Sequence, residues 1–103
     1  MPKRKNQNPR EYSLQHCKER ARERYGFELL DNDYDTLTHQ IKNDLVASLF
    51  PKDTSKFPRI NQEGAQVTMI VPLRKRQLVC VFDMDSGLLK TLLPPEQFSE
   101  HLG

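Results

Sequence analysis

Three side chains within one predicted helix have the types and spacing for phosphate chemistry. His16, Arg20 and Arg24 follow one another at intervals of four residues, so a helix places them on one face. An imidazole changes its charge near neutral pH, and guanidinium groups bind phosphate through several N–H groups. The pattern therefore fits a surface that binds phosphate and moves a proton near pH 7. An ordinary exposed helix face fits the same residues, and both interpretations stay open.

The distribution of charge points to the same end of the chain. Eight basic and three acidic residues give residues 1–24 a formal charge of +5, so the remainder carries −3 of the total of +2. Such asymmetry favours a polyanionic partner. The alternative is a solvated helix face that follows a disordered basic tail.

Length and composition predict a single domain in a reducing cytoplasm. The chain has 103 residues, 36% of them hydrophobic, which suits a flexible basic tail at 1–9 and one folded unit at 10–103. It has no long apolar run for a membrane helix and no secretory signal. Cys17 and Cys80 are far apart in the sequence, so we expect two small buried side chains rather than a disulfide or zinc site.

Motifs of several large enzyme classes are absent. The sequence contains no P-loop, no Rossmann glycine pattern, no His-Glu-x-x-His and no nucleophile elbow. We therefore expect neither a metal nor a small-molecule cofactor. Asp83 and Asp85 resemble a metal-binding pair, but with Ser86 and Gly87 they are more typical of a hairpin turn.

Apolar periodicity predicts two helices followed by an antiparallel sheet. The first helix begins at Arg10 and ends before Gly26, and the second begins at Asp31, Asn32 or Asp33, any of which can be its N-cap. Its end is ambiguous between Asn43 and Leu49. The expected buried positions are Leu14, Cys17, Ala21 and Tyr25 in the first helix, and Tyr34, Leu37, Ile41 and Leu45 in the second.

Beyond residue 56 the apolar period shortens to two, which is typical of strands. Short turns between the strands imply antiparallel neighbours, so the predicted fold class is α+β: two N-terminal helices on a three- to four-stranded meander, with the helices covering one sheet face. Residues 96–102 are expected to form either a short helix or a frayed end. The predicted strands are 57–62, 65–71, 78–82 and 88–93, with turns at 74–76 and 83–87.

Longer segments resemble a known family. The run from His16 to Gly26 has the pattern H-x-x-x-R-x-x-x-R-Y-G, and Val81-Phe82-Asp83 and Leu89-Lys90-Thr91-Leu92-Leu93-Pro94 match its later motifs. Over residues 13–95 the layout is similar to the barnase–colicin–RelE ribonuclease superfamily, which includes toxins that cut RNA without a metal. Phe82 stands where that pattern often has a tyrosine.

The resemblance implies metal-independent RNA cleavage, in which a ribose 2′-OH attacks the adjacent phosphate. It makes His16 the acid–base candidate, with Arg20 and Thr91 beside it in the catalytic set. The phosphate- and RNA-binding candidates that it implies are Arg24, Arg59, Arg74 and Arg76. By analogy it also implies an antitoxin or a host protein as partner.

Each assignment has a structural alternative. Arg59 also fits a charge that protects a strand edge, and Arg74 and Arg76 fit turn residues that aid solubility. Thr91 fits an ordinary strand position. At the level of function, the alternative is a non-catalytic module that binds RNA or protein on the same fold.

Overall fold

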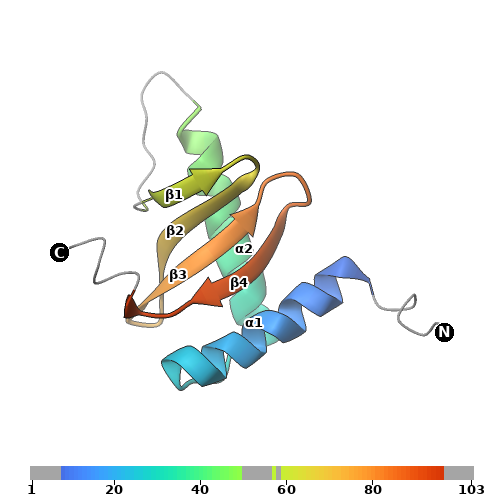
Figure 1. Ribbon diagram of the computed structural model, residues 1–103, viewed down its shortest axis with the longest axis vertical. Helices are drawn as coiled ribbons and strands as arrows, with labels where there is room; N and C mark the ends of the chain where they lie inside the picture. Colours follow the sequence, from blue (N-terminus) through green and yellow to red (C-terminus); the bar gives the residue numbers. More distant parts are fainter. Residues whose placement is uncertain (1–7, 50–56, 58, 97–103) are drawn as a thin grey trace.

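The computed structural model describes residues 8–49, 57 and 59–96, and has the predicted α+β architecture (Figure 1). Two helices precede four strands, as the apolar periodicity predicts. The predictions for residues 1–7 of the tail and for a short helix or frayed end at 96–102 lie outside the described residues, apart from Glu96. The elements are α1 (Pro9–Tyr25), α2 (Asp31–Ala47), β1 (Arg59–Glu63), β2 (Gln66–Leu73), β3 (Arg76–Asp83) and β4 (Leu88–Leu93).

The ends of both helices follow from capping. The Asn8 side chain accepts a hydrogen bond from the Glu11 N–H at 2.8 Å, and Pro9 then starts α1 one residue before the predicted Arg10. Gly26 ends α1 in the left-handed conformation (φ 70°), as predicted. The N-cap prediction for α2 is wrong, because that position is Leu30. Asp33 instead accepts a hydrogen bond from the Leu30 N–H at 2.9 Å.

α2 runs past Asn43, one of its two predicted ends, and ends at Ala47, with Ser48 as its C-cap. The Ser48 N–H bonds to the carbonyl oxygen of Asp44, and its hydroxyl group donates to that of Leu45 at 2.7 Å. These bonds satisfy carbonyl groups that the end of a helix leaves free.

The four strands form a meander in the order β1-β2-β3-β4, with antiparallel neighbours throughout. β2 continues through Pro72 to Leu73, beyond its predicted end. Leu73 pairs with Arg76 across a two-residue turn, so Pro72 occupies a position whose N–H would point away from β3. On its other side, β2 pairs with β1 only as far as Met69, the partner of Arg59. The lack of an N–H group at Pro72 therefore interrupts no hydrogen bond between the described parts of these strands.

A β-bulge in β4 decides which side chains of that strand enter the core. Val81 pairs with Thr91 and Phe82 with Leu89, which leaves Lys90 as an extra residue. Leu89 and Leu92 consequently both lie on the core face although they are three residues apart, and both are fully buried. Thr91 is directed to the opposite face.

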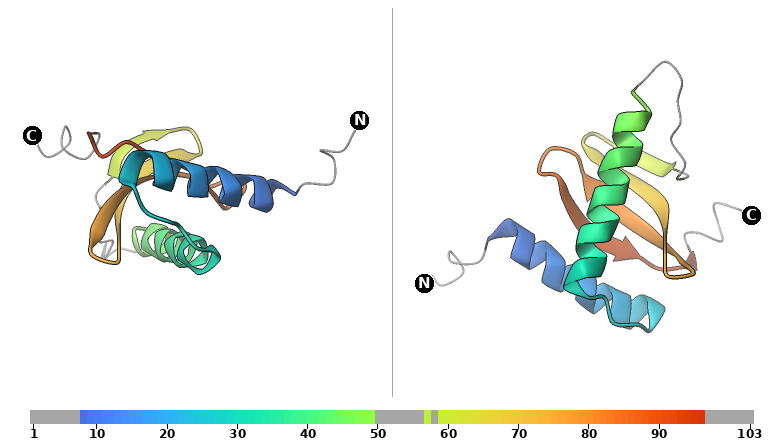
Figure 2. Two further views of the ribbon diagram at one scale, coloured as in Figure 1. Left: turned by 90° about the horizontal axis from the view of Figure 1, so that it is seen from below. Right: turned by 180° about the vertical axis from the view of Figure 1, so that it is seen from behind.

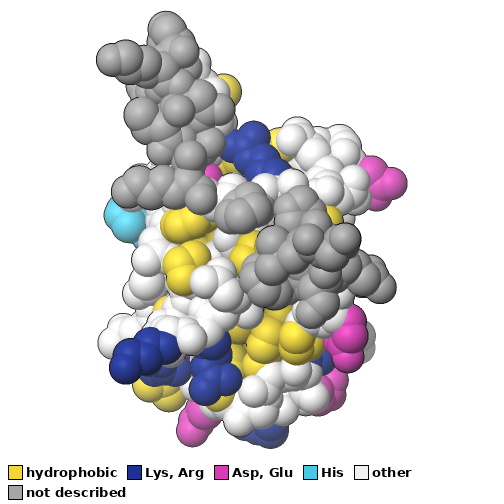
Figure 3. Space-filling view, turned by 90° about the vertical axis from the view of Figure 1, so that its left-hand side faces the viewer, with side chains coloured by type: hydrophobic (Ala, Val, Ile, Leu, Met, Phe, Trp, Pro, Cys, Tyr) yellow, Lys and Arg dark blue, Asp and Glu magenta, His cyan; other side chains and the backbone are white. Residues whose placement is uncertain are grey.

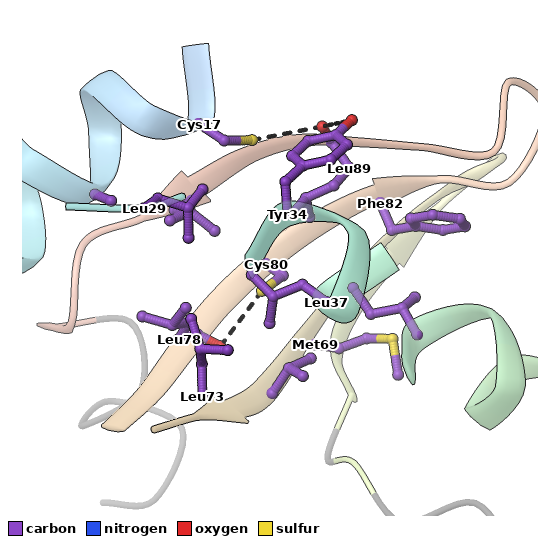
Figure 4. Packing of buried hydrophobic residues seen from close by; sticks show 14 of the residues in the cluster. Cys17, Leu29, Tyr34, Leu37, Met69, Leu73, Leu78, Cys80, Phe82 and Leu89 are labelled. Carbon is purple, nitrogen blue, oxygen red and sulfur yellow. Dashed lines mark hydrogen bonds between the residues drawn. The ribbon is translucent and has the colours of Figure 1, made fainter. Parts of the chain in front are cut away.

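The core lies between α2, the inner face of the sheet and the inner side of α1 (Figure 4). Both cysteines are buried with free thiols, as predicted. Of the predicted helix positions, Leu14, Tyr25 and Leu45 are half-buried at the edge of the core. The fully buried side chains from the helices are Cys17, Ala21, Tyr34, Leu37 and Ile41, and those from the sheet's core face include Val67, Met69, Val71, Leu78, Cys80, Leu89 and Leu92.

The two helices occupy different places on the sheet (Figure 2). α2 crosses one face, as expected, but the expectation that α1 covers the same face is wrong: α1 lies along the outer edge of β4. Side chains of α1 donate hydrogen bonds to β4 carbonyl oxygens, Arg24 to Leu92 at 2.7 Å and Tyr25 to Leu93 at 2.7 Å. The helix thereby covers strand-edge polar groups that would otherwise lack partners.

Candidate functional site

His16 lies half-buried on α1, one turn beyond Tyr12. The two rings are stacked, with centroids 6.2 Å apart and planes 10° from parallel. Burial lowers the pKa of His16 below its ordinary value, and the positive charges of Arg20 and then Arg24 lower it further. The imidazole is therefore mostly neutral at pH 7 and free to accept a proton.

Arg20 and Arg24 share the face of α1 that carries His16, as the spacing predicts, but each already has a partner within the protein. Arg20 forms an ion pair with Glu23 at 2.6 Å. Arg24 donates to the Leu92 carbonyl oxygen at 2.7 Å. Each of these contacts uses one nitrogen of the guanidinium group, so further N–H groups stay available to an anion.

Arg74 and Arg76 lie at the other end of α1, around the ring of Phe27. The Arg76 guanidinium carbon is 4.4 Å from the centroid of that ring, and Arg76 donates to the Tyr25 carbonyl oxygen at 3.3 Å. Arg74 forms an ion pair with the largely buried Asp33 at 2.9 Å. Figure 3 shows basic side chains gathered at the lower end of its view, where Figure 1 places the turn between β2 and β3.

Thr91 and Arg59 lie on opposite edge strands of the sheet. Thr91 is half-buried on β4, the strand that α1 contacts, whereas Arg59 is exposed on β1. Three strand spacings separate β1 from β4, which corresponds to about 14 Å. The structure thus brings His16, Arg20, Arg24 and Thr91 to neighbouring elements, α1 and β4, and places Arg59 across the sheet from them.

Two features of the structure were not predicted from the sequence. Tyr12 stands four residues before His16, and this i, i+4 spacing was the available signal for their stacking. The second feature is a pair of surface cavities of about 640 and 380 Å³ that lie along α2. They depend on contacts between distant segments, and no local pattern marks them.

The Asp83–Gly87 segment is a hairpin turn, as predicted. The Asp83 carboxylate accepts hydrogen bonds from the Asp85 N–H at 3.3 Å and from the Ser86 hydroxyl group at 2.9 Å. Within residues 8–49, 57 and 59–96, no group of three or more His, Cys, Asp or Glu side chains is placed to hold a metal ion.

No protein-family model matches the chain, and no curated protein or solved structure shows significant similarity to it. Neither described helix is long and apolar enough to cross a membrane. The functional assignment therefore depends on the site itself.

Proposed function

We propose that this protein is a metal-independent ribonuclease of the toxin type, with His16 as its acid–base group. The observation that carries the proposal is the lowered pKa of His16, caused by burial and by Arg20. A neutral imidazole beside two guanidinium groups combines a proton acceptor with an anion-binding surface. The resemblance of residues 13–95 to the barnase–colicin–RelE superfamily supports the same reaction.

In the proposed reaction, a ring nitrogen of His16 accepts the proton of the ribose 2′-OH as its oxygen attacks the adjacent phosphorus. The bond from phosphorus to the 5′ oxygen breaks, and the departing oxygen takes a proton from water. Arg20 and Arg24 stabilise the negative charge that develops on the phosphate oxygens, and the Thr91 hydroxyl group donates to one of them. The products are a 2′,3′-cyclic phosphate and a 5′-hydroxyl end.

The second candidate function is passive binding of RNA or protein on the same fold. It is favoured by the partners of the basic side chains: Arg20 pairs with Glu23, Arg24 with the Leu92 carbonyl group and Arg74 with Asp33. Guanidinium groups engaged in this way support the fold and add a positive field without forming a catalytic site. Under either function we propose a cytoplasmic location, with RNA as a partner and an antitoxin or a host protein as a second one.

The decisive experiment is incubation of wild type and His16→Ala with total RNA in EDTA, resolved on a denaturing gel. A general base contributes about 10²–10⁴-fold, so we expect cleavage by wild type and a loss of at least about 10²-fold in the variant. His39→Ala is the matched control, because His39 is an exposed histidine on α2 and lies outside the proposed site. Circular dichroism confirms that both variants fold.

The ends of the products separate the two functions. Cyclic phosphate ends formed by wild type and by His39→Ala support the ribonuclease. Intact RNA in every lane contradicts it. In that case, salt-dependent RNA binding that His16→Ala leaves within a few-fold indicates the passive module.

A further inference from the structure

An open groove runs between the C-terminal half of α2, strand β1 and the turn between β3 and β4. Figure 2 (right) shows this half of α2 passing between that turn and β1. The groove has a volume of about 640 Å³, and its floor includes the buried ring of Phe82. It lies away from His16 and Arg20, so nothing in the proposed ribonuclease reaction uses it.

The groove collects exposed apolar side chains. Val46, Leu49 and Met84 line it with exposures of 51%, 80% and 40%. They are three of the five large apolar side chains that are exposed among the described residues, the others being Tyr12 and Leu30. Apolar side chains scattered singly over a surface need no explanation, but several in one hollow indicate an interaction site.

The rim of the groove is positively charged. Lys42 on α2 and Arg59 on β1 contribute to its lining, and no Asp or Glu is among the described residues that do so. In the part of the chain that the structure describes, neither cation forms an ion pair, in contrast to Arg10, Lys18, Arg20 and Arg74. An occupant that carries carboxylates beside apolar side chains would complement both features.

We infer that this groove binds a short, acidic, amphipathic segment of another protein. Its apolar side chains fill the hollow between Val46, Leu49 and Met84, and its carboxylates lie against Lys42 and Arg59. Seating an amphipathic segment in an apolar groove is a common mode of peptide recognition. An open groove with a wall residue as exposed as Leu49 suits a peptide better than a small molecule, which pockets generally enclose. The inference is independent of RNA cleavage.

A random linear peptide library displayed on phage and selected against the full chain tests this inference. We expect the enriched peptides to combine Asp or Glu with Leu, Ile, Val or Phe. The strongest peptide is then synthesised with a fluorescent label, and its affinity for each variant is measured by anisotropy. Loss of the cations in Lys42→Glu/Arg59→Glu should weaken binding by about tenfold or more and remove most of its salt dependence. Leu49→Ser should weaken binding to a similar extent.

Two matched controls keep the result specific to the groove. Arg22→Glu reverses an exposed charge on α1, and Leu30→Ser replaces an exposed leucine at the start of α2; both should bind the peptide like wild type. The inference is overturned if no peptide is enriched, if the enriched peptides lack acidic residues, or if the groove variants bind like the controls. Light scattering adds a further outcome: a dimer that Lys42→Glu/Arg59→Glu dissociates would assign the groove to a second copy of this chain instead.

Discussion

The phenol group of Tyr25, the last residue of α1, donates a hydrogen bond to the carbonyl oxygen of Leu93 on β4 over 2.7 Å. The phenol oxygen of Tyr25 in turn accepts a hydrogen bond from the Val79 N–H on β3 at 3.0 Å. Val79 and Leu93 are partners in the β3–β4 register, so the hydroxyl group of Tyr25 bridges the two strands where their pairing ends. One side chain thus joins the C-terminal end of α1 to both strands.

Tyr25→Phe should destabilise the fold by about 1–3 kcal/mol, because it removes the hydroxyl group and leaves a strand N–H and a strand carbonyl group without their partner. Urea unfolding followed by circular dichroism measures the free energy of unfolding. Tyr12→Phe is the control, since Tyr12 is 60% exposed and its hydroxyl group has no recorded partner among the described residues. Equal stability of the two variants would show that the bridge contributes nothing.

The pKa of His16 should lie below 6.5, its ordinary value, because burial and the charge of Arg20 both disfavour the imidazolium form. Arg20→Gln should raise this pKa toward the ordinary value, whereas Arg22→Gln on a different face of α1 should leave it unchanged. NMR titration of the imidazole protons measures both effects. A His16 pKa at or above 6.5 in wild type would contradict the prediction and remove the main support for its role as a base.

The lowered pKa of His16 also predicts a pH dependence of stability. The unfolded chain, whose His16 titrates at about 6.5, binds the proton more tightly than the folded protein does. Stability is therefore retained above pH 6.5 and falls as the pH drops through 6.5 toward the folded-state pKa. His16→Gln should flatten this acidic decline in thermal melts recorded between pH 5 and 7, a range in which histidine titrates. An unchanged decline would assign it to other groups.

Neither cysteine should react with iodoacetamide in the folded protein at pH 8. Burial raises the pKa of Cys17 to about 12 and also raises that of Cys80, so both remain thiols, whereas the thiolate is the reactive form. Mass spectrometry should find the protein unmodified in buffer and modified twice in concentrated urea. Rapid modification of either thiol in buffer would show that the core opens near it.

Lys75→Gly should stabilise the protein by about 0.5–1 kcal/mol. The two-residue turn between β2 and β3 holds Arg74 at φ 45° and Lys75 at φ 71°, a region in which residues with a Cβ atom are strained. Lys75 is the better position to change because Arg74 also pairs with Asp33. Unfolding in urea measures the increase in the free energy of unfolding. The control is Gln77→Gly at an exposed strand position, which should lower the free energy of unfolding by about 0.5–1 kcal/mol. A decrease of the same size in Lys75→Gly would contradict the expectation.

Short-range patterns in the sequence predicted most of the secondary structure. The steps of three and four between Tyr34, Leu37 and Ile41 required a helix, and all three side chains are buried. Gly26 marked the end of α1 because its conformation is left-handed. The alternation of Val67, Met69 and Val71 predicted a strand, but Ile70 between them is also buried. Such features depend on residues a few positions apart, so local reasoning finds them.

The candidate site could be predicted only in part. The helical spacing predicted that His16, Arg20 and Arg24 lie on one face, and the structure confirms this because all three belong to α1. The carbonyl group that Arg24 contacts belongs to Leu92, which is 68 residues away. No local pattern encodes that contact, nor the separation of Arg59 from Thr91 by the width of the sheet.

By itself, the sequence determined the order and type of the elements and the buried stripes of both helices. It also determined that His16, Arg20 and Arg24 share one face of α1. Only the tertiary structure decided that α1 packs along the edge of β4, that the bulge at Lys90 turns both Leu89 and Leu92 inward, and that Lys42 and Arg59 meet at one groove. The physical reason is the range of the interactions involved. Periodicity and capping act within one or two turns of chain, whereas the pairing of strand edges and the shape of cavities depend on segments that approach each other only after folding.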